Sequence, residues 1–367
     1  MRHIWGLDCL RFIAALLVVS FHFRAFGLYH PDFRAAPLDR AFPWMESYTW
    51  FGWIGVQIFF VISGFVIAAS AMDCTTREFI VKRSIRVFPA LWFSTLAAFA
   101  IRAFYGEPIA QLVGPLIKSM ALSPLGPYID GVIWTLVVEL IFYIYIVILM
   151  QVPRSLFDRE RSLELGAYVL GLSSCAFTAV HLYSVAAGSS MASILGRFFM
   201  DLTLLRHGML FGLGMLVYRA WRGGLTPLIG GSLLLFTLFG SVQIALRSGL
   251  ETPFWMPVTL WIPGLAVLLL SLRWSSITLQ PRLKMACKTL GLLTYPLYLN
   301  HFTLGRYLTP ILAPLIARRE ILAVVVFAMI LGFSWFVLEV PERHVQRSWR
   351  KRFHVDRSKP AIAASLP

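Results

Sequence analysis

The first long apolar stretch of the chain contains an arginine and a histidine, which are rare in such surroundings. Arg11 and His22 stand eleven residues apart in RFIAALLVVSFH. In a helix, this spacing returns to within about 20° of the same face and rises about 16 Å. An ionisable group at the centre of a bilayer costs roughly 2.5 to 3.5 kcal/mol, so it usually has a partner or a function. We expect both side chains to face one groove. The alternatives are a rim arginine paired with Asp8 and a hydrogen-bonded core histidine.

Two further ionisable groups are expected at the depth of His22. Glu139 in WTLVVELIFY lies about eight residues below the outer membrane surface, and His301 in TYPLYLNH lies about eleven residues into a helix that starts on the inner side. Tyr298 shares the helical face of His301. An imidazole with a neighbouring carboxylate can act as a general base on a hydroxyl group. The shared depth therefore predicts a site, although a buried glutamate can also be purely structural.

Basic residues gather at the opposite end of this groove. In VKRSIRVFPALW, Arg83 and Arg86 are one helical turn apart at the start of an apolar segment. A helix N-terminus also favours anions. We expect these arginines and Arg11 to bind a phosphate-bearing ligand, with a simple topogenic anchor as the alternative. Glu339 and Glu342 are expected at the same rim, where one of them would pair with an arginine.

The two clusters together match the shape of an acyl-coenzyme A. Its phosphorylated head would bind the arginines, and its long uncharged arm would carry the thioester to the histidines. The rival hypothesis is a transporter or flippase for a polar or anionic solute, in which the same groups form a proton relay. Arg206, His207 and Arg306, near the far side, would contact an acceptor from there.

The elements that must position these residues are membrane-spanning helices. The chain has 367 residues, of which 58% are hydrophobic and 14% charged, and a mean hydropathy of +0.73. This composition excludes an ordinary soluble protein. Ten apolar segments are long enough to cross a bilayer as helices, which predicts an all-α polytopic integral membrane protein. They lie at about 10–28, 51–71, 87–105, 131–150, 163–186, 200–219, 225–246, 256–273, 290–314 and 320–339.

The distribution of charge predicts the orientation. The net charge is +15, and about three times as many Lys and Arg fall on the side of the N-terminus as on the other. Both termini should therefore be cytoplasmic, with membrane lipid rather than nucleic acid as the partner of the basic residues. We predict one transmembrane domain over 1–345 and a basic cytoplasmic tail over 346–367 that is disordered at its end. The four cysteines have no metal-like spacing, so no metal site is expected.

Five motifs in this order resemble acyltransferase family 3. They are RFIAALLVVSFH, GVQIFFVISGFVI, RSIRVFPALW, WTLVVELIFY and TYPLYLNH, and they span nearly the whole chain. The resemblance implies a ten-helix fold that transfers an acyl group, often acetyl, from cytoplasmic acyl-CoA to a glycan or another hydroxyl acceptor. Some members carry an extracytoplasmic hydrolase-like domain, for which we find no counterpart.

The resemblance also assigns roles to the matching positions. Arg11 and His22 become the central pair, Arg83 and Arg86 lie near the donor, and Glu139 is a supporting acid. We therefore expect an acyl-CoA-dependent O-acyltransferase of the bacterial cytoplasmic membrane, acting on a polysaccharide or a lipid-linked sugar. The further supporting candidates are Tyr298, His301, Arg206 and Thr135, which stands where the family usually has serine.

Overall fold

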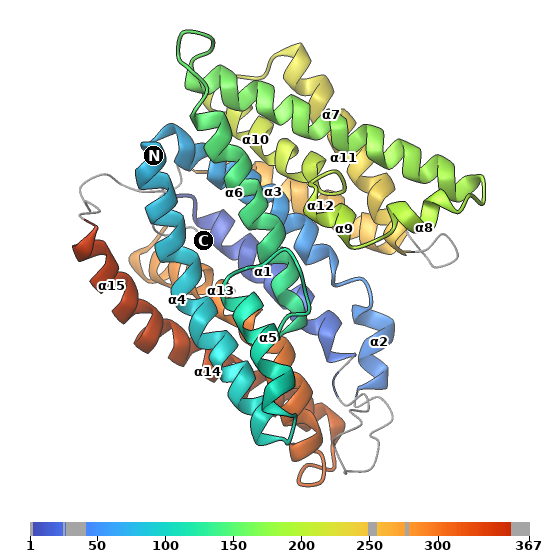
Figure 1. Ribbon diagram of the computed structural model, residues 1–367, viewed down its shortest axis with the longest axis vertical. Coiled ribbons are helices and arrows are strands. Elements are labelled where there is room, and N and C mark those ends of the chain that lie inside the picture. The colour runs from blue at the N-terminus through green and yellow to red at the C-terminus, as the bar shows by residue number, and fades with distance from the viewer. Residues whose placement is uncertain (1–2, 25, 27–41, 249–254, 276–278, 354–367) are drawn as a thin grey trace.

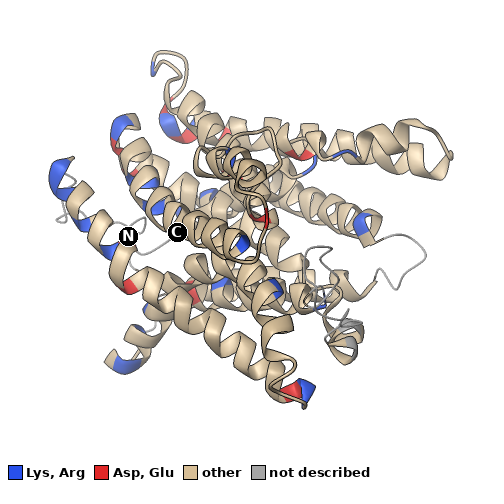
Figure 2. Ribbon diagram, turned by 60° about the horizontal axis from the view of Figure 1, so that its bottom comes forward, with Lys and Arg blue, Asp and Glu red and all other residues tan. Residues whose placement is uncertain are grey.

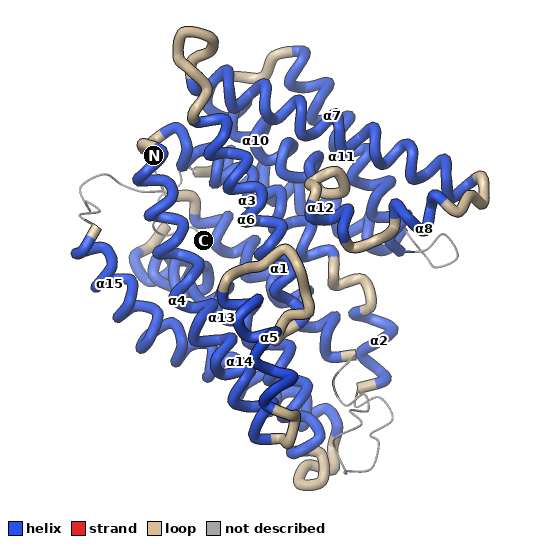
Figure 3. Tube along the Cα trace, in the orientation of Figure 1, coloured by secondary structure: helices blue, strands red, loops and turns tan. Residues whose placement is uncertain are grey.

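The structure is a bundle of helices (Figures 1 and 3). It is a computed structural model, and it describes residues 3–24, 26, 42–248, 255–275 and 279–353. The protein is 81% helical, and none of the described residues forms a strand. The predicted all-α polytopic membrane fold is therefore confirmed.

Eight helical segments in the described part are long and apolar enough to cross a membrane. The other two predicted spans are also helices: α10 (Gly208–Gly223) has 16 residues, and α13 (Pro281–Leu312) has 32. The eight segments contain α1 (Trp5–Phe23), α3 (Ile54–Met72), α4 (Thr76–Phe104), α6 (Trp134–Met150), α7 (Arg159–Ala186), α11 (Pro227–Ser248), α12 (Trp255–Arg273) and α14 (Arg319–Val337).

Shorter helices connect the long ones. The apolar patch between the third and fourth spans, too short to cross, is the 12-residue helix α5, where the Met120 carbonyl accepts from Trp92 Nε1 of α4 at 3.1 Å. The predicted basic tail begins within α15, and its expected disordered end, 354–367, lies outside the described residues. The short elements are α2 (Pro43–Thr49), α5 (Ile109–Met120), η1 (Gly131–Ile133), α8 (Met191–Leu195), α9 (Phe199–Leu202), η2 (Leu338–Glu342) and α15 (Arg343–Arg352).

Helix α3 occupies the core of the bundle and touches α10 closely. A Cβ atom on Gly64 would lie 2.1 Å from the carbonyl oxygen of Phe211, and one on Gly214 would lie 2.0 Å from that of Val61. Small residues allow membrane helices to approach in this way. Helix α1 packs against α3 and α13, so the residues of α1 and α13 that were predicted to share one depth come from neighbouring helices.

Charged residues lie mainly toward the ends of the helices, and most of the helical surface is uncharged (Figure 2). This pattern suits a bundle surrounded by lipid. We call the end of the bundle where α1 begins the inner end and the end where α1 finishes the outer end. The charge distribution predicts that the inner end faces the cytoplasm.

The sixth predicted span begins later than expected. The apolar pattern predicted a helix over 200–219, but α10 starts at Gly208. Leu204 has a φ of 61°, a left-handed conformation that interrupts a helix. The side chain of Asp201 binds both Arg206 and His207. Since these contacts hold the segment in an irregular path, Arg206 and His207 precede the helix instead of lying within it.

Candidate functional site

Two histidines from neighbouring helices form the centre of the site. Nδ1 of His22, in the last turn of α1, lies 2.8 Å from Nε2 of His301 in α13. Nδ1 of His301 lies 2.7 Å from the backbone carbonyl oxygen of Tyr298. His301 is fully buried, whereas His22 is partly accessible. The structure thus joins two of the three groups that were expected at one depth.

This chain of hydrogen bonds fixes the protons on both rings. A carbonyl oxygen only accepts, so Nδ1 of His301 must donate to Tyr298. In the neutral ring, Nε2 of His301 is then an acceptor, and Nδ1 of His22 must donate to it. Nε2 of His22 is consequently unprotonated. A backbone carbonyl one turn of helix away therefore leaves His22 with a lone pair for use as a base.

Tyr298, one helical turn before His301, lines a small cavity toward the inner end, and neither histidine is among its lining residues. Its volume is about 70 Å³. Tyr298 links it to the pair, because its hydroxyl is 2.8 Å from Thr135 Oγ1 while its carbonyl binds His301. The predicted supporting residues Tyr298, His301 and Thr135 are thus brought together. The residues lining the cavity are Arg11, Val56, Phe59, Phe60, Ser63, Thr135, Leu136, Glu139, Thr294, Tyr295 and Tyr298.

Glu139 lies in this cavity and is held by a residue that the sequence did not single out. Ser63 Oγ of α3 donates to Glu139 Oε1 at 2.5 Å. Glu139 is one helical turn further along α6 than Thr135, which places it nearer the inner end. The side-chain hydrogen-bond partner of His22 is His301, so Glu139 does not orient His22 directly as expected. Ser63 lies in GVQIFFVISGFVI, one of the five family motifs, but that motif was given no site residue.

Arg11 enters the cavity with unused donors. Its side chain is buried, and neither Nε nor Nη1 has a hydrogen-bond partner among the described residues. The alternative pairing with Asp8 forms no hydrogen bond in the described structure: Asp8 Oδ2 contacts His3 Nε2 at 2.6 Å, and Asp8 Oδ1 has no partner. A buried donor left without a partner costs about 1 to 3 kcal/mol. A ligand oxyanion would remove that cost.

Arg83 and Arg86 lie near Arg11 and within its electrostatic range. The guanidinium carbon of Arg83 lies 5.6 Å from the ring centre of Phe79 and 5.8 Å from that of Tyr143. Arg83 also lines a second, mostly apolar cavity of about 230 Å³. The two cavities adjoin, since Leu136 and Glu139 line both of them.

Arg86 forms the ion pair that was expected at the inner rim. Its Nη1 lies 3.1 Å from Oε1 of Glu342, and both side chains are buried. The remaining nitrogens, Nε and Nη2, have no hydrogen-bond partner in the described part of the chain. Glu339 instead binds Arg343 within the same helical segment. Arg86 is thus half paired and retains donors for an anion.

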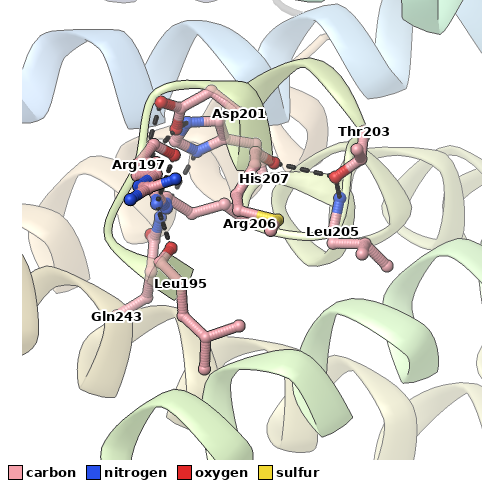
Figure 4. A network of polar contacts seen from close by, with 9 residues as sticks. Leu195, Arg197, Asp201, Thr203, Leu205, Arg206, His207 and Gln243 are labelled. Atoms are coloured by element: carbon pink, nitrogen blue, oxygen red, sulfur yellow. Dashed lines mark hydrogen bonds and ion pairs between the residues drawn. The ribbon is translucent and has the colours of Figure 1, made fainter. Parts of the chain in front are cut away.

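Arg206 lies apart from these residues, with its donors bound inside the protein. Its Nη1 contacts both carboxylate oxygens of Asp201 at 2.8 and 2.9 Å, and its Nη2 donates to the carbonyls of Leu195 and Arg197 at 2.5 and 3.1 Å (Figure 4). These bonds occupy Nη1 and Nη2 of Arg206, which was expected to contact an acceptor. Arg206 thereby holds the segment before α10 in place through bonds to Leu195, Arg197 and Asp201.

Comparison with known proteins is in keeping with this arrangement. A family model described as an acyltransferase domain matches residues 4–339, nearly the whole chain. The protein belongs to acyltransferase family 3. The resemblance expected from the motifs is thus confirmed, and membership makes this protein a multi-pass membrane acyltransferase. The chain has no significant match among curated proteins or among solved structures.

Proposed function

We propose that the protein is an acyl-CoA-dependent O-acyltransferase of the bacterial cytoplasmic membrane. Its acceptor would be a hydroxyl group of a polysaccharide or of a lipid-linked sugar. The observation that carries this proposal is the hydrogen-bond chain from His22 through His301 to the Tyr298 carbonyl, from which we infer an unprotonated Nε2 on His22. A base of this kind is what a weakly acidic hydroxyl needs before it can attack a thioester.

The donor would enter from the inner end. Arg11, Arg83 and Arg86 would bind the phosphates of coenzyme A, since Arg11 and Arg86 keep buried donors without partners. The uncharged arm would pass through the apolar 230 Å³ cavity into the 70 Å³ cavity. A water needs roughly 10 to 15 Å³ of such space, so the smaller cavity suits an acyl group of a few heavy atoms. This favours acetyl.

The reaction follows from these positions. Nε2 of His22 takes the proton of the acceptor hydroxyl, and the acceptor oxygen forms a bond to the thioester carbonyl carbon. The carbon–sulfur bond breaks, and the imidazolium of His22 returns the proton to the departing thiolate of coenzyme A. Glu139, held by Ser63, would accept a hydrogen bond from an amide N–H group of the donor arm.

The test supplies radiolabelled acetyl-CoA to membranes that contain the wild type or His22→Ala. We expect label in the glycan fraction of the wild type and about 10² to 10⁴ times less in the variant. His344→Ala is the matched control, because His344 is exposed in α15 and lies outside the site. Equal labelling by wild type and His22→Ala, or no labelling by the wild type, would contradict the proposal.

A further inference from the structure

A third and larger cavity opens at the outer end of the bundle. Its volume is about 450 Å³, within the range of about 300 to 1,000 Å³ typical of small-molecule sites. Trp134 in its wall precedes Thr135, whose hydroxyl contacts Tyr298 of the histidine site. Helices α6, α7 and α11 and the segment before α10 line it, through Trp134, Phe177, Thr178, His181, Gly196, Phe198, Asp201, Arg206, Gln243, Leu246 and Arg247.

One buried acceptor in this cavity has no partner. Nε2 of His207 lies 2.8 Å from Oδ1 of Asp201, so this nitrogen donates to the carboxylate (Figure 4). In the neutral ring, Nδ1 of His207 accepts from Nε2 of Gln243 at 3.3 Å. The orientation of the Gln243 amide is thereby fixed, and its Oε1 has no hydrogen-bond partner in the described structure. The Gln243 side chain is only 5% exposed. A ligand hydroxyl would donate a hydrogen bond to this oxygen, Oε1 of Gln243.

One cation in this cavity is also available. Arg247 follows Gln243 by one turn of α11, so both lie on the same face. Its guanidinium carbon lies 4.8 Å from the ring centre of Trp53 and 5.9 Å from that of Trp134, and its side chain is exposed. No described residue forms a hydrogen bond or an ion pair with it. Arg206 in the same cavity differs, because its donors are bound to Asp201 and to carbonyls.

We propose that this cavity binds the acceptor and that the acceptor is a sugar bearing an oxyanion. A guanidinium binds a carboxylate or phosphate through paired hydrogen bonds, which assigns the anionic group to Arg247. Gln243 Oε1 would accept from a sugar hydroxyl. The rings of Trp134 and Phe198 offer flat apolar surfaces on which the C–H face of a sugar packs. This inference rests on the proposed function and names the class of its substrate.

Two kinds of acceptor carry such an oxyanion, a uronic acid in a glycan and the diphosphate of a lipid-linked sugar. The test measures binding to the full chain in lipid nanodiscs without acyl-CoA. The probes are methyl β-glucuronide, farnesyl-diphosphate-linked glucose and, as the neutral match, methyl β-glucoside. We expect at least one anionic probe to bind about ten times more tightly than the glucoside. The preferred anionic probe identifies the kind of acceptor.

Arg247→Gln should abolish this preference, and Arg247→Lys should retain part of it. Arg219→Gln is the matched control, since Arg219 pairs with Glu160 and Glu164 outside the cavity and should keep the preference. Retained binding of acetyl-CoA shows that each variant is folded. Equal binding of neutral and anionic probes by the wild type, or an unchanged preference in Arg247→Gln, would overturn the inference. If the proposed function were wrong, membranes with the wild type would transfer no label from acetyl-CoA to the glycan fraction.

Discussion

Nδ1 of His22 lies 2.8 Å from Nε2 of His301, so one hydrogen bond joins the last turn of α1 to α13. His301 in turn donates to the backbone carbonyl of Tyr298. A backbone carbonyl can only accept a hydrogen bond, so the donor and the acceptor are fixed in both bonds that link Tyr298, His301 and His22. His301 is therefore a positioning residue, which acts on the reaction by setting the tautomer of His22.

Replacement of His301 should separate this role from simple packing. In His301→Ala, Nδ1 of His22 loses its acceptor, and a lost bond of this kind costs about 1 to 3 kcal/mol, or roughly 5- to 150-fold in rate. In His301→Gln, the amide oxygen can accept from Nδ1 of His22, so part of the rate should return. The measurement is kcat over a pH series. Equal loss in both variants with an unchanged pH profile would assign His301 a packing role only.

Arg11 should act on the donor and not on the acceptor. Because its Nε and Nη1 have no hydrogen-bond partners among the described residues, Arg11→Gln should raise the Kd of acetyl-CoA. A hydrogen bond to a charged group is worth about 1.5 to 3 kcal/mol, which corresponds to roughly 10- to 150-fold. Isothermal titration of purified protein measures this change. Arg222→Gln is the control, since Arg222 is bound to Tyr218. An unaltered Kd in Arg11→Gln would remove Arg11 from the donor site.

Hydropathy and helical spacing are local properties, so the sequence predicted the helices and the shared depth of His22 and His301. His22 in the last turn of α1 meets His301, eleven residues before the end of the longer α13, because the two helices pack against each other. The partner of Glu139 was not predictable in this way, since Ser63 reaches it from a helix 76 residues away in the sequence. The start of α10 also depends on side-chain bonds from Asp201 to Arg206 and His207, which hydropathy does not register although they are close in the sequence. Arg247 was not singled out, because in the sequence it looks like any other arginine at the end of an apolar segment.

The buried pair of Arg86 and Glu342 should contribute to stability. Removing one partner leaves an uncompensated buried charge, which costs about 3 to 5 kcal/mol. Glu342→Ala should therefore lower the unfolding temperature of the purified protein in detergent, whereas Arg86→Met with Glu342→Leu should recover much of the loss. Glu339→Ala is the matched control, because its pair with Arg343 is partly exposed and such pairs contribute about 0 to 1 kcal/mol. Similar unfolding temperatures for Glu342→Ala and Glu339→Ala would contradict this.

The contact between α3 and α10 gives the sharpest prediction about the fold. An added methyl group on Gly64 would meet the backbone oxygen of Phe211 at 2.1 Å. A flexible side chain could change its rotamer to avoid the methyl group. The backbone oxygen of Phe211 can avoid it only if α3 and α10 move apart. Overpacking usually costs about 1 to 3 kcal/mol, and more where the neighbours cannot move. We therefore expect Gly64→Ala to reduce the yield of monodisperse protein on size-exclusion chromatography.

Gly231→Ala is the control, because it lies in α11 and a Cβ there meets nothing within 4 Å. Alanine is favoured over glycine in a helix by up to about 1 kcal/mol, so this variant should be as stable as the wild type or slightly more. The same substitution thus has opposite expected effects at two helical positions. Equal thermal stability of Gly64→Ala and Gly231→Ala would contradict the close contact of α3 and α10, in which a Cβ on Gly64 lies 2.1 Å from the Phe211 carbonyl oxygen.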